Sequence, residues 1–300
     1  MRRALAPAIP APGGLTAPSF RRSPLGRRLL RNAGAVLGLV LLGAIAAVAL
    51  ASVLYVPQNP YRIAVDRRFE PPGPLHPFGT DDLGRDVFSR VMVGARISLG
   101  VAGCVLLVAG AVGVPLGILA GYRGRIVDEA IMRATDVFLA FPSFLLAMAI
   151  VAALGSSLTN AILAVGVAWW PRYARLMRGQ VLGLLHAPYV EAARAAGAGE
   201  GRILARHLFP NCLAPLLVQM ASDAGNAILV TASLSFVGLG AKPPTPEWGF
   251  MVAQGRQYLL TAWWIPIAPG AAIGATVAGF MLVGDALRDL LDPKLQRLRI

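Results

Sequence analysis

The chain contains six apolar blocks, each long enough to cross a lipid bilayer as a helix. The first block, 33–55, would measure roughly 33 Å at about 1.5 Å per residue, against a hydrocarbon core of about 30 Å. It exceeds the apolar core of a cleavable signal peptide, so we interpret it as a retained span. The other five blocks lie at about 97–121, 131–154, 158–180, 212–238 and 262–286.

Composition supports a membrane protein of the all-α class. Hydrophobic residues make up 56% of the chain and charged residues only 14%, whereas a soluble domain has about 25% charged residues. The net charge of +13 is spread mostly between the apolar blocks, which suits contact with anionic lipid headgroups. No basic cluster is interleaved with aromatic residues, so we do not expect nucleic acid as a partner.

The basic residues predict an orientation for the six transmembrane helices. With both termini in the cytoplasm (N-in/C-in), 20 of the 28 Lys and Arg residues fall on the inner side and 8 on the outer side. The predicted organisation has five parts. These are a disordered basic cytoplasmic tail (1–32), the first transmembrane helix (33–55), an extracytoplasmic loop (56–95), the main transmembrane domain (96–290) and a cytoplasmic C-terminal tail (291–300).

The polar stretch 188–211 has the design of two short helices joined by a bend. Pro188 suits a first helical turn, and Glu191 in the same turn suits the helix dipole. Gly197 is expected to end this helix, and Pro210 to close the next one. One face of the second helix would carry Ile203, Leu204, His207 and Leu208. From spacing alone, an amphipathic connector on the membrane surface is the alternative.

The same stretch resembles the EAA loop of bacterial ABC-importer permeases. The likeness lies in EAA, three residues, Gly, and a closing Phe-Pro. In that family the loop is the coupling helix that docks into a cytoplasmic ATPase. The chain departs from the signature at His207 and Phe209, where Ile and Leu are preferred. The resemblance assigns ATPase coupling to Glu191, Ala192, Ala193, Gly197, His207 and Pro210.

The end of the first long loop is rich in charged residues. Thr80 is expected to cap a helix whose first turn holds Asp81 and Asp82, and this helix would lie at the interface and lead into the second span. Cation binding by Asp81, Asp82 and Asp86 is the alternative, but their spacing is not that of a calcium loop. We predict no metal site on this chain.

A second resemblance extends over about residues 75–296. HPFGTDDLGRDVFSRVMVGARISL, RATDVFLAFPSFLL, SLSFVGLGAKPPTPEWGFM and LVGDALRDLLDPKL are similar to motifs of the dipeptide/oligopeptide/nickel permease family. The resemblance implies a type I ABC importer permease-like fold. It implies as partners a second homologous permease, two ABC ATPases that hold ATP and Mg, and an extracytoplasmic substrate-binding protein. Its extracytoplasmic motif comprises Gly79, Thr80, Asp81, Gly84, Arg85 and Asp86.

Ionisable residues within the spans need a partner or a water-filled cavity. Asp136 is predicted to form a salt bridge with Arg133 near the cytoplasmic interface. Asp223 and Asn226 share a helix face, and with Thr231 they suit either a translocation path or a hydrogen bond to the partner permease. The chain departs from the family here, because the family commonly has Glu at the position of Thr231. An Asp at the position of Asp223 is not typical of the family.

Aromatic residues suggest where two segments meet the membrane surface. Trp169, Trp170 and Tyr173 are expected at headgroup depth, at the point where the fourth span leaves the membrane. The late loop 242–263 is rich in proline and aromatic residues. It suits either an aromatic belt or a docking surface for the binding protein. The aromatic residues concerned are Trp248, Tyr258 and Trp263 in the loop and Trp264 directly after it.

The sequence argues against an enzyme. A P-loop requires Gly-Lys, and neither lysine follows a glycine. No GxSxG or HExxH motif occurs, and no catalytic cluster of a membrane-embedded enzyme is visible. The rival function is a proton- or ion-coupled secondary transporter acting alone, with Asp136 and Asp223 as relays. The sequence does not name the solute.

Overall fold

The computed structural model describes residues 32–291. The predictions for the N-terminal tail before residue 32 and for the C-terminal tail after residue 291 lie outside this range. The described part is helical, with one isolated β-bridge between Thr80 and Asp86. Its elements are α2 (Ala33–Leu54), η1 (Val65–Arg67), α3 (Val87–Arg123), α4 (Arg125–Leu139), α5 (Ser143–Leu154), α6 (Leu158–Leu184), α7 (Pro188–Ala195), α8 (Glu200–Ile203), η2 (Leu204–Leu208), α9 (Phe209–Phe236), α10 (Trp248–Gly255), η3 (Arg256–Tyr258) and α11 (Trp264–Leu291).

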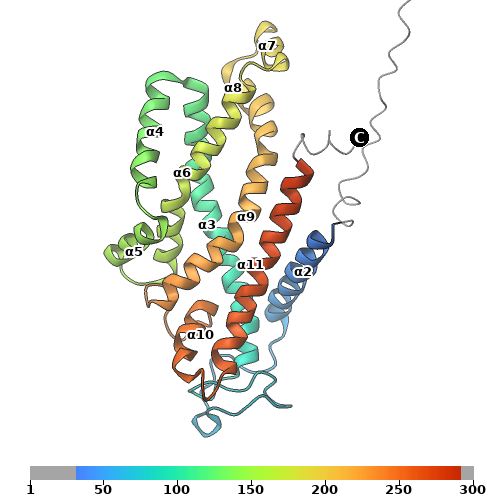
Figure 1. The fold of residues 1–300 in the computed structure, drawn as a ribbon, viewed down its shortest axis with the longest axis vertical. Coiled ribbons are helices and arrows are strands. Elements are labelled where there is room, and N and C mark those ends of the chain that lie inside the picture. The colour runs from blue at the N-terminus through green and yellow to red at the C-terminus, as the bar shows by residue number, and fades with distance from the viewer. Residues whose placement is uncertain (1–31, 292–300) are drawn as a thin grey trace, which may run out of the picture.

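The long helices run along the length of an elongated molecule, and its two ends differ in structure (Figure 1). Helices α7 and α8 form one end, where α6 passes into α9. Helix α10 and the irregular segment 55–86 form the other end. The first turn of α2 and the last turn of α11 both point toward the end that carries α7.

Four helices are long and apolar enough to cross a membrane: α2, α3, the continuous helix from α8 through α9, and α11. Helices α4 and α5 become a fifth candidate if they count as one span, bent by 86° at the break that contains Pro142. Helix α6 has 27 residues but is less apolar, because its second half carries Arg172, Arg175 and Arg178. The prediction of six spans is therefore not confirmed by length and composition.

Helix α3 differs from its predicted form. It begins at Val87 and continues without a break to Arg123, whereas the sequence suggested an interfacial helix followed by a span from about residue 97. The predicted start of this helix at Thr80 is wrong, because the charged residues before Val87 fold into a compact loop and the helix begins later. In contrast, α2 ends within one residue of the predicted first span.

Helices α3 and α6 pack at backbone distance along a row of glycines. Gly113, Gly117 and Gly121 recur every fourth residue on α3 and face α6. A Cβ atom at Gly113 would lie 2.3 Å from the carbonyl oxygen of Trp170, and one at Gly117 would lie 2.3 Å from that of Ala174. Small residues with this spacing let helices approach closely in lipid, where van der Waals packing is the main attraction.

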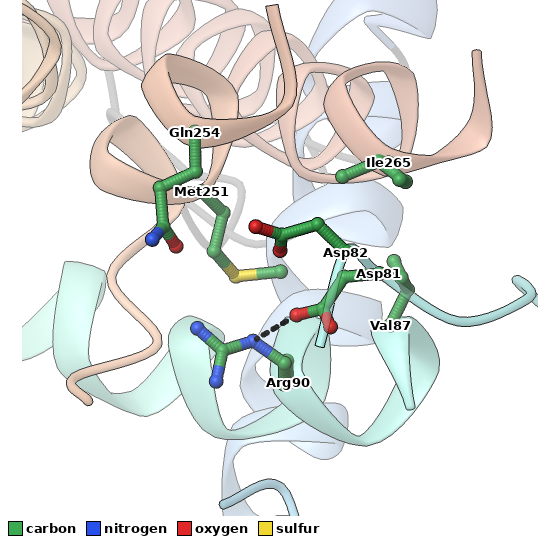
Figure 2. A pocket seen from close by; sticks show the side chains of 7 residues that line it. All are labelled: Asp81, Asp82, Val87, Arg90, Met251, Gln254 and Ile265. Atoms are coloured by element: carbon green, nitrogen blue, oxygen red, sulfur yellow. Dashed lines mark ion pairs between the residues drawn. The ribbon is translucent and has the colours of Figure 1, made fainter. Parts of the chain in front are cut away.

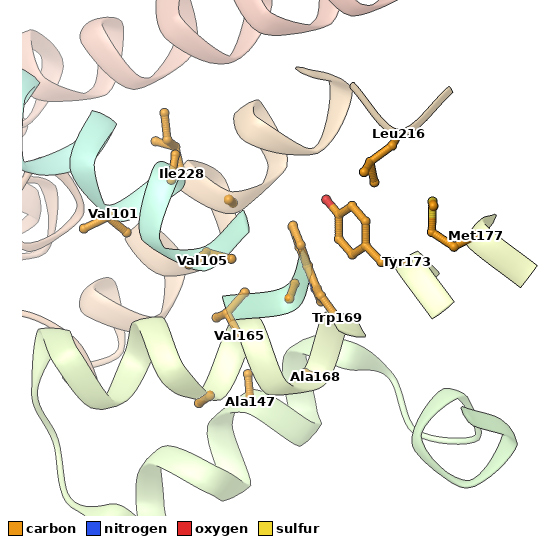
Figure 3. Packing of buried hydrophobic residues seen from close by; sticks show 14 of the residues in the cluster. Val101, Val105, Ala147, Val165, Ala168, Trp169, Tyr173, Met177, Leu216 and Ile228 are labelled. Carbon is orange, nitrogen blue, oxygen red and sulfur yellow. The ribbon is translucent and has the colours of Figure 1, made fainter. Parts of the chain in front are cut away.

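The largest buried cluster joins α3, α5, α6 and α9 (Figure 3). Trp169 and Tyr173 lie inside it and are almost fully buried, and Trp170 is 7% exposed. Their depth at the headgroups stays a prediction, while their burial shows that they pack inside the helical bundle. These rings fill the space between helices of the same chain, which hydropathy alone does not distinguish from a position at the membrane surface.

The glycine row gives a direct test of the α3–α6 contact. Replacing Gly117 with Leu places a side chain against the α6 backbone, so we expect a loss of stability of about 1–3 kcal/mol, the typical cost of overpacking. Thermal unfolding of the detergent-solubilised protein measures the effect. Gly103→Leu is the matched control, because Gly103 lies on an open face of the same helix. Equal midpoints for both variants would contradict the close packing.

Candidate functional site

The predicted coupling stretch forms a short helix, α7, at one tip of the molecule (Figure 1). Pro188 occupies its first turn as predicted, and Glu191 is the acidic residue of that turn. Both side chains are exposed, as is Ala192, while Ala193 is half-buried. The helix therefore presents a small, mostly exposed surface with one negative charge near its positive end.

The bend after α7 is a well-formed helix end. Gly197 has a φ angle of +78°, which favours glycine. Its N–H donates to the carbonyl oxygen of Arg194, and the N–H of Ala198 donates to that of Ala193. This pair of hydrogen bonds is the Schellman arrangement, which satisfies the last carbonyls of a helix. The predicted break at Gly197 is confirmed.

The second predicted helix has no separate end. Helix α8 passes through the π-helical segment η2 directly into α9, and Pro210 lies in the first turn of α9. The prediction that Pro210 closes a helix is wrong. In η2 the N–H of Phe209 donates to the carbonyl oxygen of Leu204, five residues earlier, and this wider turn lets the helix continue into Pro210. His207 lies half-buried in the same segment.

The tip is attached to the helical core by buried apolar side chains. Val190 of α7, Ile203 of α8 and Leu208 of η2 are each at most 2% exposed and belong to the main hydrophobic cluster. An ion pair of 3.9 Å between Arg123 and Glu200 also connects the end of α3 to α8, although both side chains are exposed. The tip is thus a stiff extension of α6 and α9 with an open outer surface.

At the opposite end, Asp81 is the centre of a buried ionic cluster. Its Oδ1 accepts hydrogen bonds from the N–H groups of Leu83 and Arg85, each at 2.9 Å. Its Oδ2 accepts from Nε of Arg85 at 2.7 Å and lies 3.7 Å from Nε of Arg90. Asp81, Arg85 and Arg90 are all at most 4% exposed. Burial with several partners fixes their geometry.

Asp86 provides the cap of α3. Its Oδ2 accepts from the N–H of Ser89 at 2.7 Å, and its Oδ1 lies 2.8 Å from Nδ1 of His76. The prediction that Thr80 caps this helix is wrong, because Asp86 lies directly before the first helical residue. Thr80 instead accepts from the N–H of Glu70 through its hydroxyl oxygen.

Within residues 32–291 no group of three His, Cys, Asp or Glu side chains could hold a metal ion.

Two glycines and two tryptophans hold the segment before α3 against the neighbouring chain segments at this end. Gly79 and Gly84 have φ angles of +67° and +72°, and a Cβ atom at Gly84 would lie 1.8 Å from the carbonyl oxygen of Ala64. The indole N–H of Trp264 donates to the carbonyl oxygen of Thr80, at 3.0 Å. That of Trp248 donates to Val91, also at 3.0 Å. The motif residues Gly79, Thr80, Asp81, Gly84, Arg85 and Asp86 therefore come together in one folded unit with α10 and α11.

Glu247 caps α10 from a buried position. Its two carboxylate oxygens accept from the N–H groups of Gly249 and Phe250, each at 2.9 Å. The side chain lies outside the four candidate spans, and burial raises its pKa above the ordinary value, while the two N–H groups act in the opposite direction. Sequence analysis missed this residue. The pattern Pro-Glu-Trp before an apolar run was its available signal.

The three predicted path residues lie on α9. Asp223 is 3% exposed, and its Oδ2 accepts from the hydroxyl of Tyr173 and from Nε2 of Gln219, both at 3.0 Å. Thr231 is buried and donates to the carbonyl oxygen of Ala227. Asn226 is half-buried. The Tyr173–Asp223 bond joins α6 to α9 within this chain, and sequence analysis did not anticipate Tyr173 as the partner.

Asp136 has a different partner from the predicted one. It forms an ion pair with Arg175 of α6, whereas Arg133 pairs with Glu129 at 2.9 Å. The prediction of an Asp136–Arg133 pair is wrong. Asp136 binds a residue of α6, whereas Arg133 binds a residue of its own helix, α4. Arg175 lies 39 residues further along the chain, beyond the reach of local spacing rules.

Comparison with known proteins supports a transport function. Residues 113–297 match the family model described as "binding-protein-dependent transport system inner membrane component". This match covers more than half of the 300 residues. The chain belongs to this family. It is a multi-pass membrane protein of a transport family and not of an enzyme class. Residues 23–72 also match the N-terminal transmembrane domain of oligopeptide transport permease C.

Several curated relatives of this permease are similar over most of its length. It is 47% identical to the dipeptide transport system permease protein DppC of Escherichia coli K12, over 89% of this chain and 91% of that one. It is 43% identical to a putative peptide transport system permease protein of Brucella abortus, over 96% and 98% of the two chains. It is 48% identical to a probable D,D-dipeptide transport system permease protein of Escherichia coli K12, over 79% of each.

Solved structures support the fold of the permease. The chain is similar to a chain of the MetNI methionine ABC transporter in an inward-facing conformation, with a TM-score of 0.51 and 20% identity. The similarity covers 67% of this chain and 96% of that chain. At this identity the comparison concerns the fold alone, and the predicted likeness to a type I ABC importer permease agrees with it.

Removing the cap of α3 tests the folded unit around Asp81. Asp86→Ala deletes the acceptor for the N–H of Ser89 and leaves Nδ1 of His76 without its hydrogen-bond partner, so we expect a loss of about 1–2 kcal/mol. Thermal unfolding in detergent is the measurement. Asp66→Ala removes an exposed carboxylate of η1 at the same end and serves as the control. The assignment is wrong if both variants unfold at the wild-type temperature.

The raised pKa of Glu247 predicts a pH dependence of stability. A folded-state pKa above the ordinary value of 4.5 means that the unfolded chain binds fewer protons between the two values. Stability therefore falls as pH rises through this window. Unfolding midpoints measured from about pH 4.5 upward should decline less steeply for Glu247→Gln than for wild type. Parallel pH profiles would show that Glu247 does not contribute.

Proposed function

We propose that this chain is a permease subunit of an ATP-driven ABC importer that moves dipeptides or other short peptides across the bacterial cytoplasmic membrane. Family membership and 47% identity to a dipeptide permease over 89% of the chain support the solute class. A second homologous permease would complete the passage. Two ABC ATPases would hold ATP and Mg, and an extracytoplasmic protein would deliver the solute. No cofactor is assigned to this chain itself.

We propose six membrane passages with both termini in the cytoplasm. The passages would be α2, α3, the bent pair α4–α5, α6, α9 and α11. The shared direction of the ends of α2 and α11 supports an even number of passages (Figure 1). The distribution of 20 basic residues on the inner side against 8 on the outer side supports the orientation. The end that carries α7 would then face the cytoplasm, and the end with α10 would face outward.

The observation that carries the proposal is the construction of the α7 tip. Its outer surface is open, while Val190, Ile203 and Leu208 attach it to the core from which α6 and α9 extend. A partner that pushes or rotates this tip would move both helices together. Glu191 would anchor the first turn of the docked helix, and Ala192 and Ala193 would let the partner approach closely. Gly197, His207 and Pro210 would shape the bend and the start of α9.

In the proposed mechanism, ATP-driven closure of the ATPases displaces the α7 tip as a rigid body. The helices of the two permeases then rock and expose a central cavity alternately to each side. Asp223, Asn226 and Thr231 would lie along or near this passage on α9. Because Asp223 is hydrogen-bonded to Tyr173, its role would be to keep α6 and α9 together during the movement.

A secondary transporter acting alone makes a different prediction. It would take up peptide in vesicles that contain this chain without ATPases, and an uncoupler would abolish the uptake. The proposed importer would show uptake only with ATP, the two ATPases, both permeases and the binding protein. Uptake of labelled dipeptide into proteoliposomes of these two compositions distinguishes the two functions.

The bend at Gly197 gives a test of coupling. Gly197→Val forces a β-branched residue into a left-handed backbone conformation, which distorts the end of α7. We expect at least a tenfold drop in dipeptide uptake per ATP hydrolysed by the reconstituted complex, with the protein still inserted. Gly197→Asn should retain most coupling, because Asn tolerates this conformation.

Gly199→Val is the matched control for this experiment. Gly199 is exposed, has room for a side chain and has an ordinary negative φ angle, so the same added volume should leave coupling near wild type. If Gly197→Val transports as efficiently as Gly199→Val, the tip does not transmit the movement.

A further inference from the structure

Helix α6 carries an arginine at every third position over one stretch, and the first of these arginines differs from the other two. Arg178 pairs with Asp128 of α4, with Nη2 donating to Oδ2 at 2.6 Å, and Arg175 pairs with Asp136 of the same helix. In the described part of the chain no carboxylate forms an ion pair with Arg172. Two charges of this row are thus neutralised within the chain, and that of Arg172 is not.

Arg172 is exposed and has only weak contacts of its own. Its Nη2 lies 3.5 Å from the hydroxyl oxygen of Ser143, the first residue of α5, and its guanidinium lies 5.0 Å from the ring centre of Trp169. A distance of 3.5 Å is too long for a strong hydrogen bond, and a cation–π contact supplies no hydrogen-bond acceptor. Most of its five N–H donors therefore have no acceptor among the described residues.

The contact between α3 and α6 fixes the level of Arg172 along the molecule. A Cβ atom at Gly113 of α3 would lie 2.3 Å from the carbonyl oxygen of Trp170. Helix α3 has no charged residue between Arg96 and Arg123, and Gly113 lies ten residues before Arg123. Ten helical residues correspond to about 15 Å. In the proposed arrangement of passages, Arg172 therefore lies well inside the membrane and away from the lipid headgroups.

Arg172 belongs to a polar strip where α4 and α5 lie beside α6 (Figure 1). Arg175 and Asp136 are 48% and 63% exposed despite their pairing. Residues 140–142, which form the break between α4 and α5, are also exposed, and the Ser143 contact places this break at the level of Arg172. Charged side chains and non-helical backbone at membrane depth require contact with protein or water, because lipid offers them no hydrogen bonds. The strip therefore does not face lipid.

The buried ionic cluster at the opposite end of the molecule differs from this strip. Arg90 is 1% exposed and forms an ion pair with Asp81 beside a pocket that has room for about one water molecule (Figure 2). A solute does not reach such a group. Arg172, in contrast, is accessible from outside the chain and lacks a carboxylate partner within it.

The charges of the strip leave one positive charge unmatched. Arg172 and Arg175 provide two positive charges, and Asp136 provides one negative charge. The guanidinium of arginine binds a carboxylate through two parallel N–H···O hydrogen bonds. Every dipeptide carries one terminal carboxylate, whatever its side chains are. A site for that carboxylate recognises the whole class of solute without selecting among side chains.

We propose that Arg172 binds the terminal carboxylate of the peptide during its passage, and that the strip formed by Asp136, Arg172 and Arg175 lines the passage. The inference rests on the proposed function, which supplies the peptide and the second permease. Asp223 is 3% exposed and accepts from the hydroxyl of Tyr173, so it supports the wall of the passage from within the helical bundle.

Neutralising Arg172 tests its role in transport. Arg172→Gln is reconstituted with the ATPases, the second permease and the binding protein. We expect at least tenfold slower dipeptide uptake, because a charge-assisted hydrogen bond to the peptide is lost. Assembly with the second permease and the Kd of the binding protein should be unchanged. Arg172→Lys should transport faster than Arg172→Gln, because it keeps the charge but not the two parallel bonds.

Arg133→Gln is the matched control. It removes the same charge from an exposed arginine of α4 that pairs only with the exposed Glu129 of its own helix. An exposed pair of this kind contributes little. The control should therefore take up dipeptide at the wild-type rate.

A cysteine at the position of Arg172 tests charge and access together. In a protein whose Cys104 and Cys212 are replaced by Ala, the assembled Arg172→Cys transporter is treated with a cationic or an anionic methanethiosulfonate. Both reagents modify thiols that water reaches. We expect both to react and only the cationic one to restore uptake, by at least threefold, because it returns the positive charge. A purely structural role of Arg172 would not be rescued in this way.

Ser143→Cys reports on the solute itself, because this position contacts Arg172. The assembled transporter is held with a non-hydrolysable ATP analogue and with binding protein saturated with alanyl-alanine. The peptide should slow modification of the Ser143→Cys thiol at least threefold. The same thiol combined with Arg172→Gln should not be protected.

Four results would each overturn the proposal. If Arg172→Cys reacts with neither reagent, the position is closed to water. If Arg172→Gln no longer assembles with the second permease, an acidic group of that subunit is the occupant. Uptake by Arg172→Gln at the rate of Arg133→Gln, or no protection of Ser143→Cys, would show that no peptide carboxylate binds there. Failure of the proposed function appears instead in the wild-type sample, as the absence of any binding-protein-dependent, ATP-driven uptake.

Discussion

Close contact between the α3 and α6 backbones is the constraint on which the rest of the structure depends. In a membrane, apolar side chains gain little by leaving lipid, so helices associate where their surfaces fit closely. The row Gly113, Gly117 and Gly121 provides such a fit over two helical turns. Helix α6 leads into α7, and the Tyr173–Asp223 bond adds α9 to the pair. The position of the α7 tip is therefore set by a contact far from it.

The two ends of the molecule use charge in different ways. Around Asp81 the charged groups are buried and paired with one another, and these pairs hold the segment before α3 in a compact form. Around α7 the charged side chains, such as Glu191, are exposed and left open on the surface. The end around Asp81 is thus held in one geometry by its own contacts, whereas the end around α7 has charged groups that are free to contact a partner. This difference fits the proposed importer, in which the subunit would receive solute on one side and force on the other.

Much of the fold was predictable from local sequence signals. The apolar block 33–55 gave α2 to within one residue, and Pro188 and Gly197 marked the limits of the first helix of the 188–211 stretch. The errors share a physical cause, which is competition between a local signal and a partner from elsewhere. Asp86 displaced Thr80 as the cap of α3, and Arg175 displaced Arg133 as the partner of Asp136. The burial of Trp169 between helices likewise depends on distant partners, which local sequence signals do not identify.

Sidedness is the property on which the proposed mechanism depends, and labelling of single cysteines measures it directly. In a protein whose Cys104 and Cys212 are replaced by Ala, Ala192→Cys and Asp66→Cys place one thiol at an exposed position on each end. A membrane-impermeant maleimide should label Ala192→Cys only in inside-out vesicles and Asp66→Cys only in right-side-out vesicles. Labelling of Ala192→Cys from outside the cell would place the α7 tip beyond the reach of any ATPase and would contradict the mechanism.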